Sequence, residues 1–208
     1  MCKLNIGIIF YQYNFDLINM LVMIFLIPFF VFMIAFLIHK YLVIPLEVLV
    51  FSPEIAEYAS LLYLPHAVRI VSYYILGPIS LVPIFFSQCI TFILFNDAEL
   101  LNTISLSTIS TLSIYLGFYL YEIIKRDNLF NITRTVDWKK IIIIGFLVSI
   151  FNSTLSSLYL NILFKKSYEY INLNYLIGDV LGLVFGMILF IFSIKFYCYW
   201  GNKIGNQN

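Results

Sequence analysis

The chain has 208 residues, of which 62% are hydrophobic and only 11% are charged. A typical soluble domain is roughly 45–50% apolar and about 25% charged, so this composition excludes an ordinary soluble domain. It also excludes intrinsic disorder, which needs low hydrophobicity and high net charge. The formal net charge of +1 provides no general attraction to nucleic acid. The sequence therefore predicts an all-α polytopic membrane protein, a helical bundle whose first partner is the lipid bilayer.

Six apolar stretches are candidate membrane spans. Crossing about 30 Å of hydrocarbon takes about 20 mostly apolar residues at 1.5 Å of rise each. The predicted spans cover residues 17–38, 59–76, 79–95, 102–124, 140–164 and 175–197. The second carries Pro65, His66 and Arg69, and an alternative is five spans plus a re-entrant half-helix that begins at Pro65, a residue suited to the first helical position. The segment Tyr41–Tyr58, rich in proline and glutamate, is predicted to be an interfacial loop, either without regular structure or with a short helix that lies in the headgroup region.

The basic residues predict how the bundle is oriented. The densest basic loop, Lys125–Lys140, belongs in the cytoplasm by the positive-inside rule. With six spans, both termini also lie in the cytoplasm. This places eight basic residues on the cytoplasmic side and three on the outer side, while Arg69 lies within a span. The loops are each shorter than about 20 residues and cannot form an independent core, so residues 1–208 are predicted to form one membrane domain. High usage of Ile, Asn, Lys, Phe and Tyr is typical of an AT-rich bacterial genome, which favours a bacterial inner membrane.

Ionisable groups inside a bilayer are costly, and each one marks a candidate functional site. His66 and Arg69 are three residues apart and share a helix face, and Asp179 lies in the last span, at a depth where it can pair with Arg69. One interpretation is a binding site for an anion or a carboxylate ligand, with Arg69 as the anchor. The other is a self-satisfied ion pair that only fixes helix order.

Hydroxyl and amide side chains concentrate in two neighbouring spans. In the fifth span, four of them fall on one stripe, and Asn152 is the candidate ligand-binding residue among them: Ser149, Asn152, Ser153 and Ser156. The fourth span carries six more: Ser105, Ser107, Thr108, Ser110, Thr111 and Ser113. This pattern favours either ordinary hydrogen bonds between helices or a polar pocket.

Small residues in the last span indicate close helix packing. Gly178, Gly182 and Gly186 follow a GxxxGxxxG pattern, which lets two backbones approach each other. Together with Pro65 they are the predicted helix-packing residues. The spacing leaves open whether the partner is another helix of this chain or a second copy in a homo-oligomer.

The sequence carries no motif of a metal, cofactor or catalytic site. Cys2, Cys89 and Cys198 form no CxxC pair, and HExxH, GxSxG and Walker patterns are absent. The chain contains two histidines, His39 and His66. We therefore expect no metal, no cofactor and no enzymatic activity.

Two short segments resemble a family of membrane-associated sensors called MASE, first type. They are Tyr63-Leu-Pro-His-Ala-Val-Arg69, followed by Gly77, and Gly178-Asp-Val-Leu-Gly182. The resemblance implies an integral-membrane sensory module with a ligand pocket near Pro65, His66, Arg69 and Asp179. Members of that family often feed a cytoplasmic signalling domain, whereas only eleven residues follow Tyr197 here. We therefore expect either that signalling requires a separate partner protein or that the chain does not signal at all.

Three functions are therefore compatible with the sequence. The first is a sensory or ligand-binding membrane module without its own output domain. The second is a small transporter or the substrate-binding subunit of one. The third is an assembly protein whose glycine face docks a partner.

Overall fold

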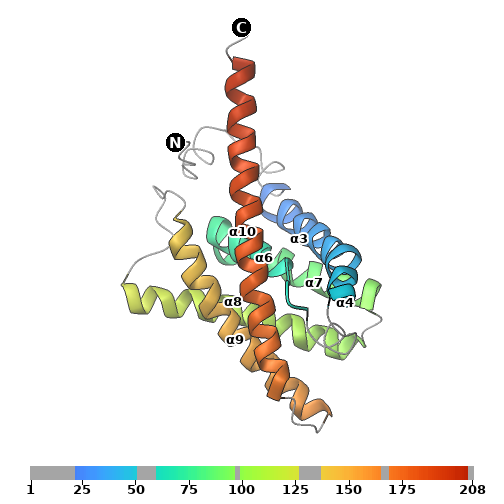
Figure 1. Cartoon of the computed structure of the whole chain (residues 1–208). Helices are drawn as coiled ribbons and strands as arrows, with labels where there is room; N and C mark the ends of the chain where they lie inside the picture. The colour runs from blue at the N-terminus through green and yellow to red at the C-terminus, as the bar shows by residue number, and fades with distance from the viewer. Residues whose placement is uncertain (1–21, 51–59, 97–98, 127–136, 165–168, 206–208) are drawn as a thin grey trace.

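A computed structural model describes residues 22–50, 60–96, 99–126, 137–164 and 169–205 of the chain. Within these residues it is a bundle of helices without strands, which confirms the predicted fold class (Figure 1). Five helical stretches are long and apolar enough to cross a membrane, close to the expected six: Val22–Leu49, Pro65–Phe95, Leu100–Lys125, Trp138–Leu163 and Asn172–Ser193. The helical, membrane-spanning character read from the composition is therefore present in the fold.

The first stretch is longer than the sequence indicated. It consists of four joined pieces: η1 (Val22–Leu26), α3 (Ile27–Ile38), η2 (His39–Val43) and α4 (Ile44–Val50). The prediction of an interfacial loop over 41–58 is thus wrong for residues 41–50, and residues 51–59 lie outside the described part. Pro45, which lacks the N–H that a helix needs, follows directly after the π-helical turn η2, where the hydrogen bonding is already irregular. The helix can therefore continue past this proline.

The second stretch is divided by a glycine. Its parts are α6 (Pro65–Leu76), η3 (Gly77–Ser80) and α7 (Leu81–Asn96). Gly77 has a φ of 74°, a conformation that favours glycine, and it ends α6. Residues 60–64 before α6 are not helical, so the prediction of a helix from residue 59 is wrong and the alternative of a short helix starting at Pro65 matches the observed boundary.

The contacts with the first stretch show that α6 and α7 run in opposite directions. At one end, the His39 ring packs against Tyr63, just before α6 begins. At the other end, η1 contacts η3, where α6 has ended. Further on, Phe92 and Phe95 of α7 return to Phe36 of α3. The stretch Pro65–Phe95 is therefore continuous in secondary structure, yet the chain turns back on itself at Gly77.

The last three helices form the other side of the bundle. They are α8 (Leu100–Lys125), α9 (Trp138–Phe164) and α10 (Glu169–Gly205), and their starts and ends include the three predicted spans. α9 packs along both α8 and α10, while α6 contacts all three. The C-terminal end of α10 extends beyond the other helices (Figure 1).

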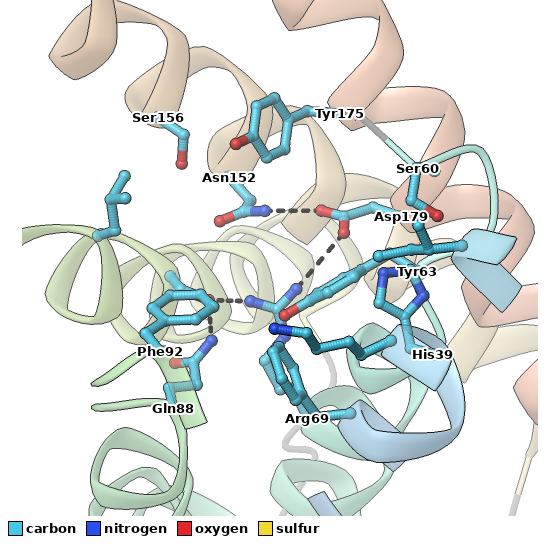
Figure 2. Close-up of a pocket in the computed structure, with 16 residues that line it drawn as sticks. His39, Ser60, Tyr63, Arg69, Gln88, Phe92, Asn152, Ser156, Tyr175 and Asp179 are labelled. Atoms are coloured by element: carbon cyan, nitrogen blue, oxygen red, sulfur yellow. Dashed lines mark hydrogen bonds and ion pairs between the residues drawn. The ribbon is translucent and has the colours of Figure 1, made fainter. Parts of the chain in front are cut away.

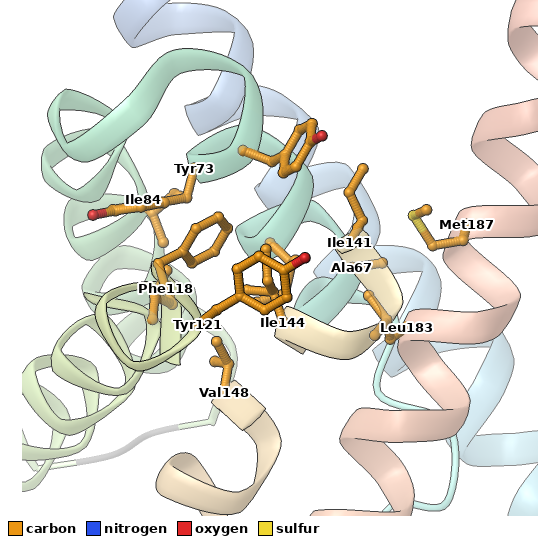
Figure 3. Close-up of a cluster of buried hydrophobic side chains, with 13 residues drawn as sticks. Ala67, Tyr73, Ile84, Phe118, Tyr121, Ile141, Ile144, Val148, Leu183 and Met187 are labelled. Atoms are coloured by element: carbon orange, nitrogen blue, oxygen red, sulfur yellow. The ribbon is translucent and has the colours of Figure 1, made fainter. Parts of the chain in front are cut away.

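Buried apolar side chains fill the space between α6, α7 and these three helices (Figure 3). Tyr73 of α6 packs against Phe118 of α8, with ring centroids 4.3 Å apart. Ile144 of α9 and Leu183 of α10 continue this cluster, and each is at most 1% exposed. This apolar core, called the core below, holds α6 between α8 and α10 and thereby positions its polar N-terminal turns.

Candidate functional site

The three glycines of α10 bring α6 into place. A side chain at Gly178, Gly182 or Gly186 would overlap Ser60, Tyr63 or Ala67 respectively. The backbone N–H of Tyr63 donates to the carbonyl of Gly178 at 2.9 Å. The predicted close packing is thus present, and its partner is the chain itself, along residues 60–67. Pro65, the fourth predicted packing residue, is buried at the first position of α6.

Arg69 is the centre of a buried hydrogen-bond network. Its side chain is 2% exposed, and its Nη2 lies 3.4 Å from Oδ1 of Asp179. Its Nη1 donates to the hydroxyl of Ser110 in α8, which also accepts from Nε2 of Gln88 at 3.0 Å. The guanidinium lies 5.3 Å from the centre of the Tyr63 ring, within the range of a cation–π contact. One cation thus links α6, α7, α8 and α10 (Figure 2).

Asp179 has a partner on each carboxylate oxygen. Oδ1 faces Arg69, and Oδ2 accepts a hydrogen bond of 2.7 Å from Nδ2 of Asn152 in α9. Nδ1 of His66 lies 3.4 Å from the same Oδ2. Removing a carboxylate from water is costly unless it is paired and hydrogen-bonded, and here both conditions hold. The four residues predicted to bind a ligand, His66, Arg69, Asn152 and Asp179, therefore lie together.

His66 contacts Arg69, Asp179 and Ser149, and the arrangement of His66 between Asp179 and Ser149 resembles a catalytic triad. Ser149 Oγ is 3.1 Å from Nε2 of His66, while Nδ1 faces Asp179. However, Nη2 of Arg69 is only 2.8 Å from Nδ1. Because a guanidinium can only donate, Nδ1 accepts this bond and the proton is on Nε2. A histidine in this tautomer cannot take a proton from Ser149, whose hydroxyl donates to the Gly145 carbonyl at 2.8 Å. These hydrogen bonds hold the His66 ring in place between Arg69 and Ser149.

A cavity of about 220 Å³ adjoins Arg69, and Figure 2 shows the side chains that line it. It is partly open, and it is lined by polar and aromatic side chains from all parts of the bundle. Its lining residues are Phe36, His39, Lys40, Ile44, Ser60, Tyr63, Arg69, Gln88, Phe92, Leu106, Ser110, Asn152, Ser156, Tyr175, Gly178 and Asp179. Of the four predicted ligand-binding residues, Arg69, Asn152 and Asp179 line the cavity, whereas His66 does not.

The hydroxyl-rich spans divide by burial. The stripe Ser149, Asn152, Ser153 and Ser156 of α9 is fully buried, as the spacing predicted. On α8, Ser107, Ser110 and Ser113 are buried. In contrast, the half-buried Ser105 and the exposed Thr108 bond to carbonyls of their own helix. Part of the pattern thus lines a polar pocket, since Ser110, Asn152 and Ser156 border the cavity, whereas the outer hydroxyls of α8 bond within their own helix.

Several residues of the site were missed in the sequence. Gln88 carried a usable signal, because it is an amide in the middle of an apolar span. Tyr175 and Phe92 carried none, since tyrosine and phenylalanine are abundant throughout the chain, and Tyr63 stood only as the first residue of the segment that resembles the sensor family. Their roles follow only from the way the helices meet.

Within the described residues, no group of three or more His, Cys, Asp and Glu side chains is arranged to hold a metal ion. No protein-family model, no curated protein and no solved structure matches the chain. The resemblance to the MASE family therefore stays a prediction from the two short segments.

Proposed function

We propose that this protein is a multi-pass membrane module that binds a small molecule in the cavity beside Arg69 and Asp179. The observation that carries this proposal is the combination of a buried ion pair, hydrogen-bonded to Asn152 and Ser110, with an adjoining cavity. An ion pair that served only to fix helix order would need no space beside it. Ligand sites in helical bundles are typically such concave spaces, with a few fixed polar groups.

The proposed role is sensory, with the signal passed to a separate partner protein. The cavity is lined from α3, α6, α7, α8, α9 and α10, so a ligand bound there contacts helices that are far apart in the sequence. A ligand that favours one arrangement of these helices shifts the population towards it. No enzymatic step is part of this proposal, because the tautomer of His66 leaves Ser149 without a base.

We further propose that both termini lie in the cytoplasm of a bacterial inner membrane. The twelve residues of α6 span about 18 Å, and the non-helical residues 60–64 add up to about 17 Å, which together match about 30 Å of hydrocarbon. Residues 60–76 and α7 then cross the membrane once each, which gives six crossings in total. With six crossings, the basic loop 125–140 lies on the same side of the membrane as the N-terminus and the C-terminus. Reporter fusions at the two termini test this: opposite locations of the reporters would contradict it.

The binding role is tested by filling the cavity. Ser156→Phe places a ring in the lining, whereas the same change at Ser193, an exposed residue of α10, serves as the matched control. Purified full-length protein in lipid nanodiscs is screened against a panel of small metabolites by thermal shift, and hits are titrated by calorimetry. We expect saturable binding to the native chain and to Ser193→Phe, and loss of binding in Ser156→Phe at an unchanged helical content. Equal binding by both variants would contradict a site in this cavity.

Transport is the second candidate, and the non-helical segment 60–64 before α6 favours it. Non-helical backbone next to a polar site, as at residues 60–64, is typical of transporters. Counterflow in proteoliposomes with each hit from the screen distinguishes the two roles, because a sensor binds without moving its ligand. The third candidate, docking of a partner on the glycine face, has lost its support, since residues 60–67 of the same chain cover this face.

A further inference from the structure

The helical bundle has two distinct ends. At one end, called the site end below, α4, α7 and α9 finish and α6, α8 and α10 begin. There the hydroxyl of Tyr159, near the end of α9, donates to Asn102 near the start of α8. At the opposite end, Trp138 at the start of α9 contacts Phe190 of α10, and η1 contacts η3. The first described helix therefore starts, and α10 leaves the bundle, at the end opposite to the site end.

The cavity occupies only the part of the bundle next to the site end. On the helices that begin there, its lining extends no further than Arg69 in α6, Ser110 in α8 and Asp179 in α10. On two helices that finish there, the lining begins at Gln88 in α7 and at Asn152 in α9. The cavity therefore lies nearer to the side of the membrane opposite to the termini.

The core closes the cavity towards the other end. On α8, α9 and α10, every core residue lies further from the site end than every residue of the lining. Phe118, Ile144 and Leu183 are three of these core residues, and each is at most 1% exposed (Figure 3). Because such side chains fill the space between the helices, the cavity can open only at the site end or sideways into the membrane.

Three oxygens of the lining keep accessible surface and take part in no hydrogen bond among the described residues. They are Oδ1 of Asn152 and the hydroxyl oxygens of Ser156 and Tyr175 (Figure 2). Nδ2 of Asn152 donates to the carboxylate of Asp179, which can only accept, so Oδ1 faces away from it. Lipid tails offer such atoms no hydrogen bond, and an unsatisfied polar group in hydrocarbon is costly. The space beside these oxygens therefore suits water or a polar solute, which disfavours an opening sideways into the lipid.

We propose that the ligand is a polar, water-soluble molecule that enters the cavity from the side of the membrane opposite to both termini. This proposal rests on the ligand-binding role proposed above and adds the route and the polar character of the ligand. With both termini in the cytoplasm, the entry side is the outer side of the membrane. The protein then responds to a solute outside the cytoplasm, and the core separates this solute from the cytoplasmic side.

Cysteine labelling in the full-length chain tests this route. The background variant lacks the native cysteines, through the changes Cys2→Ala, Cys89→Ala and Cys198→Ala. Three single variants are then made: Ser156→Cys in the lining, Lys139→Cys near the start of α9, and Thr108→Cys on the exposed face of α8 at the depth of the cavity. Each is expressed in a bacterial inner membrane and labelled with MTSES, a thiol reagent whose charge keeps it from crossing membranes. Spheroplasts present the outer face to the reagent, and inverted vesicles present the cytoplasmic face.

The proposal predicts a different labelling pattern for each position. We expect Ser156→Cys to react about tenfold or more faster in spheroplasts than in inverted vesicles, because a thiol reacts as the thiolate, which needs contact with water. Lys139→Cys should show the opposite preference, and Thr108→Cys should react in neither preparation. Tyr175→Cys, a second lining position, should behave like Ser156→Cys and so guards against a local distortion at residue 156.

The outcomes separate the route from the other proposals. Labelling of Ser156→Cys and Lys139→Cys from the same face would overturn the route. Protection of both lining positions in both preparations, as for Thr108→Cys, would overturn the connection to water. If the two preferences are exchanged, entry still lies opposite to the termini, and only their cytoplasmic location is wrong. The binding role itself is decided separately by the Ser156→Phe screen.

Discussion

The core and the polar site lie between the same helices, yet they are built on opposite principles. In the core, Tyr73, Phe118, Ile144 and Leu183 fill their space and are at most 2% exposed. In the site, Arg69 and Asp179 are equally buried, but their network leaves a cavity of about 220 Å³. Inside a membrane, packing contacts and hydrogen bonds hold helices together, because lipid tails are as apolar as leucine. The core thus supplies the close packing between the helices, and this packing allows the polar site to keep open space.

The largest effect should come from breaking the ion pair. Asp179→Leu leaves the guanidinium of Arg69 buried without its carboxylate, and we expect the free energy of unfolding to fall by about 3–5 kcal/mol. The double variant Arg69→Leu with Asp179→Leu should be more stable than this single variant, because no unpaired charge remains. Unfolding in mixed detergent, followed by circular dichroism, measures both. Additive losses in the double variant would show that the two residues act independently.

The next largest effect concerns the contact that joins α10 to the segment before α6. In Gly182→Ala the new Cβ overlaps the backbone of Tyr63, which cannot move without shifting α6. We expect a loss of about 3 kcal/mol from this overpacking. Gly145→Ala is the matched control, since its Cβ meets only the end of the Leu183 side chain, which can change rotamer. Equal losses in the same unfolding assay would contradict the close backbone contact.

A smaller effect separates the core from the cavity directly. Ile144→Ala leaves a void in a filled region, and we expect a loss of about 2 kcal/mol. Ser156→Ala removes an atom that already borders open space, so its effect should stay within about 0.5 kcal/mol. Similar losses for both changes would mean that the cavity is as tightly packed as the core.

A smaller loss than that of Ile144→Ala should come from breaking a single hydrogen bond away from both regions. The hydroxyl of Tyr159 donates to Oδ1 of Asn102 at 2.9 Å and connects α9 to α8. Tyr159→Phe removes this bond with little change of shape. We expect a loss of about 0.6 kcal/mol, the average for such bonds between membrane helices. A loss as large as that of Asp179→Leu would place this bond in the same network as the ion pair.

Two segments that the sequence analysis singled out, residues 63–69 and 178–182, lie side by side in the structure. Both segments meet, because Tyr63 bonds to Gly178 and Arg69 pairs with Asp179. The sequence could not supply the rest of the cavity lining. Phe36, Gln88 and Tyr175 come from three different helices, and only the reversal at Gly77 and the packing of α10 bring them to the same place.

The sequence by itself determined the class of fold and the identity of the central charges. Long apolar stretches can bury their backbone polar groups only as helices, and a charge among them needs a partner. The tertiary structure decided that α6 begins at Pro65 and that residues 60–67 of the same chain pack on the glycines of α10. It also decided that space remains beside Arg69. These features depend on contacts between residues far apart in the sequence, such as Ala67 with Gly186, for which local patterns carry no information.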